Sequence, residues 1–154
     1  MPGTRTIGLI SDTHGLLRPE ALEFLRGSDA IIHAGDIGNP GIIPELARLA
    51  PVTAIRGNID KAPWAQTLPA TATLDIENTK IYVVHDIAEL NLDPAAAGFS
   101  AVIYGHSHKP GHHAKHGVLY VNPGSAGPRR FSLPISLGRL LLKEQALSIE
   151  LANL

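Results

Sequence analysis

Short apolar runs recur along the chain, and most of their residues are β-branched or otherwise aliphatic. They lack the alternation of polar and apolar positions that marks a half-buried strand, so they predict strands buried on both faces. The runs that follow this pattern are residues 7–10, 30–32, 52–55, 81–84 and 101–104. Each run is followed within a few positions by a polar side chain that can bind a metal ion.

Two segments between the first three runs have the spacing of helices. Residues 19–26 begin with a proline, place Ala21, Leu22 and Leu25 on one face and precede Gly27, which is a typical helix stop. Residues 44–49 carry leucines three positions apart. The first part of the chain is therefore predicted to form a βαβαβ unit.

Beyond Pro69 the pattern changes to strands and turns. Residues 71–76 and 80–84 flank a short polar turn, residues 118–121 form a further strand, and residues 137–142 and 146–151 form a terminal hairpin. No repeat or linker interrupts the chain. We expect one α/β domain over residues 1–154, with an antiparallel second half.

Composition narrows the possible functions. The chain has 154 residues, with 13 basic and 14 acidic side chains and a formal net charge of -1, so no bulk positive charge attracts a polynucleotide or an anionic membrane. It contains no cysteine, which excludes disulfides, thiolate metal sites and cysteine nucleophiles. Residues 1–5 lack the apolar stretch of a signal peptide, and we expect a cytoplasmic protein.

Polar side chains follow all five buried runs. Loops at the carboxyl ends of neighbouring strands converge, so these side chains are expected to share one site. Turn chemistry explains one or two of them, such as Asp36 and Asn58 after glycine, but not all five positions. The candidate metal ligands are Asp12, His14, Asp36, Asn58, His85, His106 and His108.

Seven donors exceed the needs of one catalytic ion, which takes about three protein ligands. Two ions that share a carboxylate fit the number better, and Asp36 is central in the set. Without thiolates, the ions must be held by nitrogen and oxygen atoms.

The motifs Asp12-Thr13-His14, Gly35-Asp36, Gly57-Asn58, His85 and Gly105-His106-Ser107-His108 resemble those of the calcineurin-like metallophosphoesterases. The spacing is most similar to their small YfcE-like phosphodiesterase branch. The resemblance implies a four-layer α-β-β-α sandwich of two mixed sheets with helices outside. It also implies a first ion bound by Asp12, His14, Asp36 and His108, and a second by Asp36, Asn58, His85 and His106.

The resemblance further implies an enzyme that hydrolyses a phosphate ester, first of all a phosphodiester, through a hydroxide that bridges the ions. The residues expected to act at the reacting group are Asp36, Asn58 and His85. Manganese is the first choice of metal, with iron, nickel or zinc as alternatives. The expected partner is a small phosphate ester, and family members tend towards homo-oligomers. The alternatives are a phosphomonoesterase or nucleotidase, and a non-catalytic protein-binding scaffold of the same fold.

One position departs from the family pattern. Many members carry a histidine directly after the metal-binding asparagine, where it acts as a general acid, and here that position is Ile59. Isoleucine cannot donate a proton, so slow turnover or a preference for good leaving groups is expected. Asp60 and His33 are candidates to replace it, although each has a structural alternative: orienting a ligand for Asp60, and packing for His33.

Three other features have two interpretations each. Asp86 is either a partner of a ligand or a turn residue, and Arg129, with its neighbour Arg130, either meets a substrate phosphate or is solvated. Residues 122–125, Asn-Pro-Gly-Ser, are expected to present backbone N–H groups or to orient the ligand loops. The histidines of residues 112–116 are expected at the surface.

Overall fold

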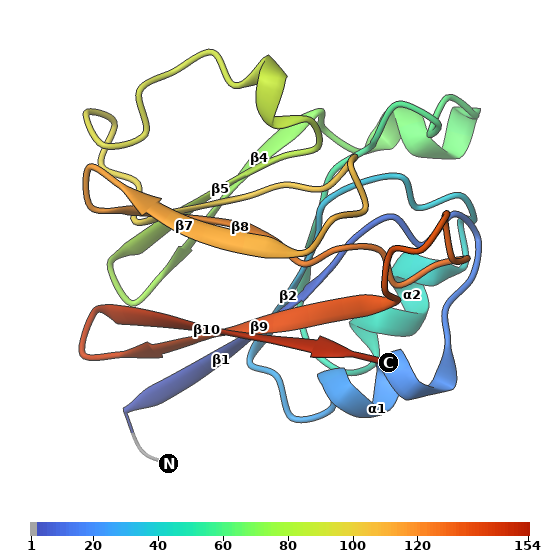
Figure 1. Ribbon diagram of the computed structural model, residues 1–154, viewed down its shortest axis with the longest axis horizontal. Helices are drawn as coiled ribbons and strands as arrows, with labels where there is room; N and C mark the ends of the chain where they lie inside the picture. The colour runs from blue at the N-terminus through green and yellow to red at the C-terminus, as the bar shows by residue number, and fades with distance from the viewer. Residues whose placement is uncertain (1–2) are drawn as a thin grey trace.

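The computed structural model describes residues 3–154 and contains two five-stranded mixed sheets that pack against each other (Figure 1). The first sheet has the strand order β10-β9-β1-β2-β3. Its strands are β1 (Thr4–Ile10), β2 (Ala30–His33), β3 (Val52–Ala54), β9 (Ser136–Lys143) and β10 (Ala146–Asn153).

The predicted βαβαβ unit is confirmed in the first sheet. β1 pairs with β2 and β2 with β3, both in parallel. The crossovers contain α1 (Pro19–Leu25) and α2 (Ile42–Ala47), so the second helix begins before Pro44 rather than at it. The terminal hairpin is also confirmed, and its strand β9 pairs antiparallel with β1.

The second sheet has the order β4-β5-β6-β8-β7. Its strands are β4 (Thr71–Ile76), β5 (Thr79–Val84), β6 (Ala101–Ile103), β7 (Gly111–Lys115) and β8 (Val118–Asn122). The expected antiparallel second half is wrong at the centre of this sheet, because β5, β6 and β8 pair in parallel. The long connection after β5 carries the chain back along the sheet, so β6 runs in the same direction as β5. The hairpin of β7 and β8 pairs these two strands antiparallel.

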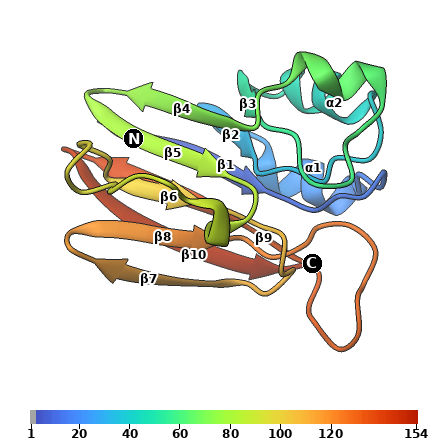
Figure 2. The same cartoon turned by 90° about the horizontal axis from the view of Figure 1, so that it is seen from above.

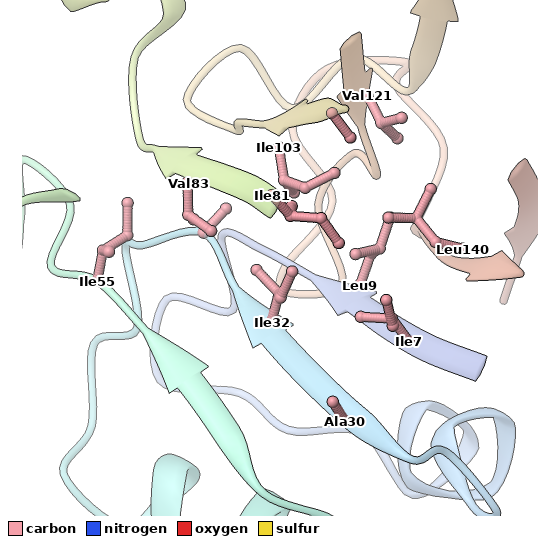
Figure 3. Packing of buried hydrophobic residues seen from close by; sticks show 12 residues of the cluster. Ile7, Leu9, Ala30, Ile32, Ile55, Ile81, Val83, Ile103, Val121 and Leu140 are labelled. Carbon is pink, nitrogen blue, oxygen red and sulfur yellow. The ribbon is translucent and has the colours of Figure 1, made fainter. Parts of the chain in front are cut away.

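The main core lies between the two sheets (Figure 3). Ile7, Leu9 and Ile32 of the first sheet meet Ile81 and Ile103 of the second, and all five are fully buried. These residues belong to the runs that predicted strands buried on both faces. Packing of both sheets on one core therefore fixes how their ends are placed relative to each other.

The outer faces of the sheets are covered differently. Both α-helices pack on the first sheet, where Leu25 and Leu46 join Ile10 and Ile31 in a second cluster. The second sheet is covered by residues 87–99, which contain one 3-10 turn, η2 (Ile87–Glu89) (Figure 1). The two mixed sheets are as expected, but within residues 3–154 the outermost layer on the second sheet is a loop rather than an α-helix. This loop suffices because it supplies apolar side chains, including Leu90 and Phe99.

The two ends of the sandwich differ in character. The hairpin turns β4–β5, β7–β8 and β9–β10 lie together at one end, on the left of Figure 2. The loops that follow β1, β2, β3, β5 and β6 lie at the other. A further 3-10 turn, η1 (Pro63–Thr67), lies between β3 and β4. In the described part of the chain, no helix is long and apolar enough to cross a membrane.

Candidate metal centre

The seven candidate ligands meet at one end of the sandwich, where loops of both sheets converge. Backbone hydrogen bonds join these loops: Asp12 donates to Gly35 O at 2.9 Å, and Gly105 donates to His85 O at 2.9 Å. We call the seven side chains the donor cluster: Asp12, His14, Asp36, Asn58, His85, His106 and His108. The structure thus brings together residues that are up to 96 positions apart in the sequence.

Most of the donor cluster has an uncommon backbone conformation. Five of its residues lie in the left-handed region, with φ between 46° and 74°: Asp12, His14, Asp36, His106 and His108. Non-glycine residues adopt this region rarely, and a group of them at one place is typical of a functional site. The loops therefore adopt a less favourable backbone conformation that directs these side chains towards one place.

Glycines before three of the candidate ligands allow close packing. A Cβ atom on Gly35 would lie 2.6 Å from His85 Nδ1, and one on Gly57 would collide with the carboxylate and backbone nitrogen of Asp36. A Cβ on Gly105 would collide with the side chains of Ser11 and Asp12. Contacts between loops therefore require glycine at these three positions. A role of glycine in a local turn would not explain this requirement.

Asp12 is fully buried, and its two carboxylate oxygens have different surroundings. Oδ2 accepts hydrogen bonds from Ser11 Oγ at 2.7 Å and from the backbone N–H of His106 at 3.2 Å. Oδ1 has no hydrogen-bond partner and faces His108 Nε2 at 3.5 Å and His14 Nε2 at 3.8 Å. One oxygen is held by the protein, and the other is directed at imidazole nitrogens.

Asp36 repeats this arrangement. Its Oδ1 accepts the backbone N–H of Ile59 at 3.1 Å, whereas Oδ2 lies 3.4 Å from His14 Nε2 and 3.3 Å from His85 Nε2. Burial opposes the charge of this carboxyl, but the contacts with His85 and with Ile59 hold its pKa below the ordinary 3.8. Asp36 is therefore ionised at neutral pH, with one oxygen between two histidines.

The four imidazoles form two pairs. The ring centroids of His14 and His108 are 5.1 Å apart, and those of His85 and His106 are 5.3 Å apart. The buried atoms His14 Nε2, His108 Nδ1 and His108 Nε2 have no hydrogen-bond partner. Buried polar atoms are nearly always paired, so their concentration here, together with Asp12 Oδ1, needs a further group to satisfy them.

The environments of His85 and His108 differ in their effect on charge. Burial lowers the pKa of His108, which favours the neutral imidazole that a metal ion requires. Burial also opposes the charge of His85, but the Asp36 carboxylate and the Ala34 carbonyl raise its pKa to about 8. His85 Nδ1 lies 2.7 Å from Ala34 O, so its N–H is used there and Nε2 faces the cluster.

Asn58 lies between the second pair of imidazoles. Its Oδ1 is 3.0 Å from His85 Nε2 and 3.2 Å from His106 Nδ1. With the amide turned over, its nitrogen would donate to these imidazoles and to Asp36 instead. An amide oxygen that faces ring nitrogens is the arrangement expected if a cation is shared among them.

The donor set fits metal ions. Two triads have donor atoms within 4.8 Å of one another: Asp12, His14 and His108 form the first, and Asp12, Asp36 and His85 form the second. They meet at Asp12, while Asp36 Oδ2 lies between His14 and His85. Carboxylate and imidazole donors suit divalent transition metals, and the set does not select one metal.

Residues 122–125 orient the ligand loops, one of the two roles expected for them. Asn122 Nδ2 donates to Gly105 O and to Ser107 Oγ, both at 3.1 Å, and so holds the loop of the two histidines. Ser125 Oγ donates to Asp12 O at 2.9 Å. The hydrogen bond from Ser11 to Asp12 was missed, because a serine beside an aspartate has no distinctive sequence signal.

His33 and Asp60 are not free to act as acids. His33 is fully buried, and burial lowers its pKa to about 4; its Nδ1 accepts from the N–H of Gly35 at 3.1 Å, and its Nε2 lies 3.0 Å from Thr13 Oγ1. Asp60 accepts the N–H groups of Ile37, Gly38 and Gly57 at 2.8–3.0 Å. These contacts are of the kind expected for a packed histidine and for a carboxylate that holds the loops of the site.

The remaining sequence candidates lie at the margins of the site. Asp86 caps η2 by accepting from the N–H of Ala88 at 3.0 Å, and its Oδ2 is also 3.8 Å from His106 Nε2. Ile59 is 44% exposed, and its side chain offers no proton. The histidines at 112, 113 and 116 are exposed on or beside β7, as expected, and His113 stacks on Tyr120.

Two hollows border the donor cluster. The larger, of about 540 Å³, is lined by Asn58, His85 and His106 together with Arg56, Asp86 and Glu89. The smaller, of about 230 Å³, is lined by His14, His108, Pro128, Arg129 and Arg130. The larger hollow therefore reaches His85 and His106. The smaller reaches His14 and His108, and Arg129 lines it.

The chain is similar in sequence to known phosphoesterases. The sequence signature of the calcineurin-like phosphoesterase superfamily domain matches residues 6–145. A probable metallophosphoesterase of Methanothermobacter thermautotrophicus is 34% identical over 140 residues, which cover 83% of this chain and 81% of the relative. A phosphodiesterase of Methanocaldococcus jannaschii is 29% identical over 136 residues, which cover 77% and 82% of the two chains.

Solved structures share the fold. An archaeal phosphodiesterase superposes with a TM-score of 0.80 at 24% identity and covers 97% of this chain and 99% of its own. Vacuolar Protein Sorting 29 of Cryptosporidium parvum superposes with a TM-score of 0.78 at 18% identity, with 98% of each chain covered. At these identities, the likeness concerns the arrangement of the two sheets.

Proposed function

The chain belongs to the calcineurin-like phosphoesterase superfamily, and we propose that it is a metal-dependent phosphodiesterase with a two-ion centre. The observation that carries this proposal is the state of Asp12 and Asp36. Each has one oxygen held by hydrogen bonding, and its other oxygen faces three histidines in Asp12 and two in Asp36. Buried carboxylates and unpaired imidazole nitrogens cost free energy in the absence of a cation that joins them.

The geometry supports the division of ligands that the family resemblance implies. The first ion would be held by Asp12, His14, Asp36 and His108, and the second by Asp36, Asn58, His85 and His106. The histidine pairs in contact are the pairs in this division. Asp36 would serve both ions, because its Oδ2 lies at similar distances from His14 of the first set and His85 of the second.

Bound divalent ions would polarise the phosphoryl group and lower the pKa of the attacking water. The chain holds the donors ready for this. The Ile59 N–H fixes Asp36, the Ala34 carbonyl fixes the ring of His85, and Ser11 fixes Asp12. Because these contacts orient the donor atoms, little reorganisation is needed at the reacting centre.

The leaving group receives little help from the protein. Ile59 has no proton to give, and His33 and Asp60 are sequestered by their own hydrogen bonds. We therefore propose a preference for esters whose alcohols are acidic, such as aryl phosphodiesters. A relative named a phosphodiesterase supports a diester rather than a monoester as the substrate.

The test is hydrolysis of bis(p-nitrophenyl) phosphate by the purified protein with added Mn²⁺. Asp36→Ala and His108→Ala should each abolish metal-dependent activity, whereas His116→Ala, at an exposed hairpin turn, should leave it unchanged. Metal analysis should find close to two ions per wild-type chain. Full activity in both cluster variants would refute the proposal, and faster hydrolysis of p-nitrophenyl phosphate would replace the diester by a monoester.

A second candidate function is a protein-binding scaffold, and the observation that favours it is Ile59, an exposed apolar side chain where a general acid is expected. The same metal analysis separates the two functions. A scaffold would retain no transition metal after anaerobic reconstitution with Mn²⁺ and would hydrolyse neither ester.

A further inference from the structure

The two hollows beside the donor cluster differ in charge. The larger is lined by one arginine, Arg56, and two acids, Asp86 and Glu89. The smaller has two arginines, Arg129 and Arg130, and no acid among its lining residues. A phosphodiester has two ester arms that leave phosphorus in different directions, so the hollows would receive arms of different chemistry.

The arginines of the smaller hollow have few partners in the protein. Within residues 3–154, the arginines that form ion pairs are Arg5, Arg26, Arg48 and Arg139. Arg129 has a single long contact, from Nη1 to Leu133 O at 3.5 Å. Arg129 and Arg130 are both exposed, on the loop between β8 and β9 that extends away from the sheets in Figure 2. Their donor groups are therefore available to a ligand.

The hollow suits a single phosphate group. Its volume of about 230 Å³ lies below the range of roughly 300–1,000 Å³ for pockets that enclose drug-sized ligands. Guanidinium groups match phosphate oxygens in a two-pronged geometry. In the proposed two-ion centre the scissile phosphate would lie between the two histidine pairs, whereas this hollow reaches His14 and His108 alone among the four histidines.

On the basis of the phosphodiesterase function proposed above, we infer that Arg129 and Arg130 bind a second phosphate of the substrate. The substrate is then a small phosphodiester that carries a further phosphate on the arm beside His14 and His108. The other arm leaves through the larger hollow. This local pair of cations is compatible with the net charge of -1, which offers no broad attraction to a long polynucleotide.

Two chromogenic esters that differ by one phosphate test the inference. They are thymidine 5′-(p-nitrophenyl phosphate) and thymidine 3′-phosphate 5′-(p-nitrophenyl phosphate), assayed with Mn²⁺. The wild type should prefer the second by about tenfold in kcat/KM, because the two guanidinium groups would contact its additional phosphate. In Arg129→Gln/Arg130→Gln, the ratio of the two kcat/KM values should fall to about one, because the additional phosphate of the second ester loses its partners.

A matched control removes the same charge elsewhere. Arg26→Gln/Arg48→Gln replaces two arginines at the C-terminal ends of α1 and α2, whose side chains are exposed and paired with Glu23 and Glu45. It should retain the tenfold preference. Circular dichroism verifies folding, and the single variants Arg129→Gln and Arg130→Gln replace the double variant if it does not fold.

Binding gives a readout that needs no turnover. Calorimetric titration should show tighter binding of thymidine 3′,5′-bisphosphate than of thymidine 5′-monophosphate to the wild type, but equal binding to Arg129→Gln/Arg130→Gln. Equal binding of both nucleotides to the wild type would overturn the inference. So would an equal loss of activity on both esters in the variant, because the arginines would then act on the scissile phosphate. If neither ester is hydrolysed, the proposed function fails, while the titration still decides the inference.

Discussion

The two ends of the sheet sandwich use the same backbone conformation for different purposes. At the hairpin end, three two-residue turns carry left-handed residues: Glu77-Asn78, His116-Gly117 and Glu144-Gln145. At the donor-cluster end, left-handed residues include Asp12 and Asp36. The turn residues are exposed, whereas the two aspartates are buried.

The difference shows what holds each conformation. A two-residue hairpin itself requires positive φ angles, because they match the twist of the paired strands. Asp12 and Asp36 lie in no such turn, and contacts with other loops hold them instead, such as the bond from Asp12 N to Gly35 O. The hairpin end is thus determined locally, and the donor-cluster end depends on the assembled protein.

Removal of the metal ions should destabilise the donor-cluster end more than the hairpin end, and this is the largest difference expected between them. If two ions each present at about 100 times their dissociation constants stabilise the fold, chelation should lower the free energy of unfolding by roughly 5 kcal/mol. Thermal unfolding with Mn²⁺ and with chelator measures this. Hydrogen exchange should become much faster at the backbone amides of Asp12 and His106, and should change little at the exposed β9–β10 turn, whose amides exchange by local opening. Equal changes at both ends would contradict the comparison.

Two glycine-to-alanine variants should lose different amounts of stability. Gly57 has no room for a side chain, whereas Gly117 has room but an unfavourable φ for one. In Gly57→Ala, the new methyl group collides with Asp36, and we expect a loss of about 3 kcal/mol or more together with loss of metal binding. In Gly117→Ala, nothing lies within 4 Å of the new Cβ, but φ is 78°, so the loss should be about 1 kcal/mol. Chemical denaturation measures both, and a larger loss for Gly117→Ala would reverse the interpretation.

Protonation of His33 should weaken the metal-free protein in acid. Its pKa is about 4 in the folded state and about 6.5 in the unfolded chain, so only the unfolded chain binds this proton between those values. Its contribution to stability is therefore present above pH 6.5 and is lost as pH falls towards 4, by about 3 kcal/mol in total. Urea denaturation across this range measures the loss.

The assignment of this effect to His33 can be checked directly. In His33→Gln, the part of the acid dependence that comes from this imidazole should disappear, although the variant is less stable at every pH because the contacts with Gly35 and Thr13 change. A nuclear magnetic resonance titration of the His33 ring should show a neutral imidazole down to about pH 5. Protonation above pH 6 would show that the ring is less buried than its contacts require.

Restoring an acid at position 59 should have the smallest effect. In Ile59→His, turnover of an alkyl phosphodiester should rise by up to about 100-fold, and that of a p-nitrophenyl ester by less, because its leaving group needs no proton. The side chain is 44% exposed and its N–H to Asp36 is retained, so folding should not change. Ile59→Asn is the matched control, because it is polar and cannot transfer a proton; an equal rise in both variants would exclude acid catalysis.

Much of the fold could be predicted from local patterns. The strands at 7–10, 81–84 and 137–142 were found because buried strands leave a run of aliphatic residues, and the helix at 19–26 because proline and glycine bound it. The expected antiparallel second half was wrong only at the centre of the second sheet, since strand direction in β5, β6 and β8 depends on long connections that carry no periodic signal. The helical layer expected over the second sheet came from resemblance, and residues 87–99 form a loop there.

The candidate site, like the fold, could be predicted only in part from the sequence. Identity of the donors could be read from the chain, because Asp12, Asp36 and the two histidines at 106 and 108 follow apolar runs that must end at a sheet edge. Their partners could not be read. That the N–H of His106 holds Asp12, that the N–H of Ile59 holds Asp36 and that Asp60 binds three backbone N–H groups all depend on atoms brought together by folding.

The sequence by itself determined the strands, the chemistry of the donors and the absence of a proton donor at Ile59, because these follow from residue type and short-range spacing. Tertiary structure alone decided which oxygen of each aspartate stays free, which histidines pair, and where Arg129 and Arg130 lie relative to them. The physical reason is that these contacts and hollows form between segments far apart in the chain. The core between the two sheets fixes the relative positions of those segments.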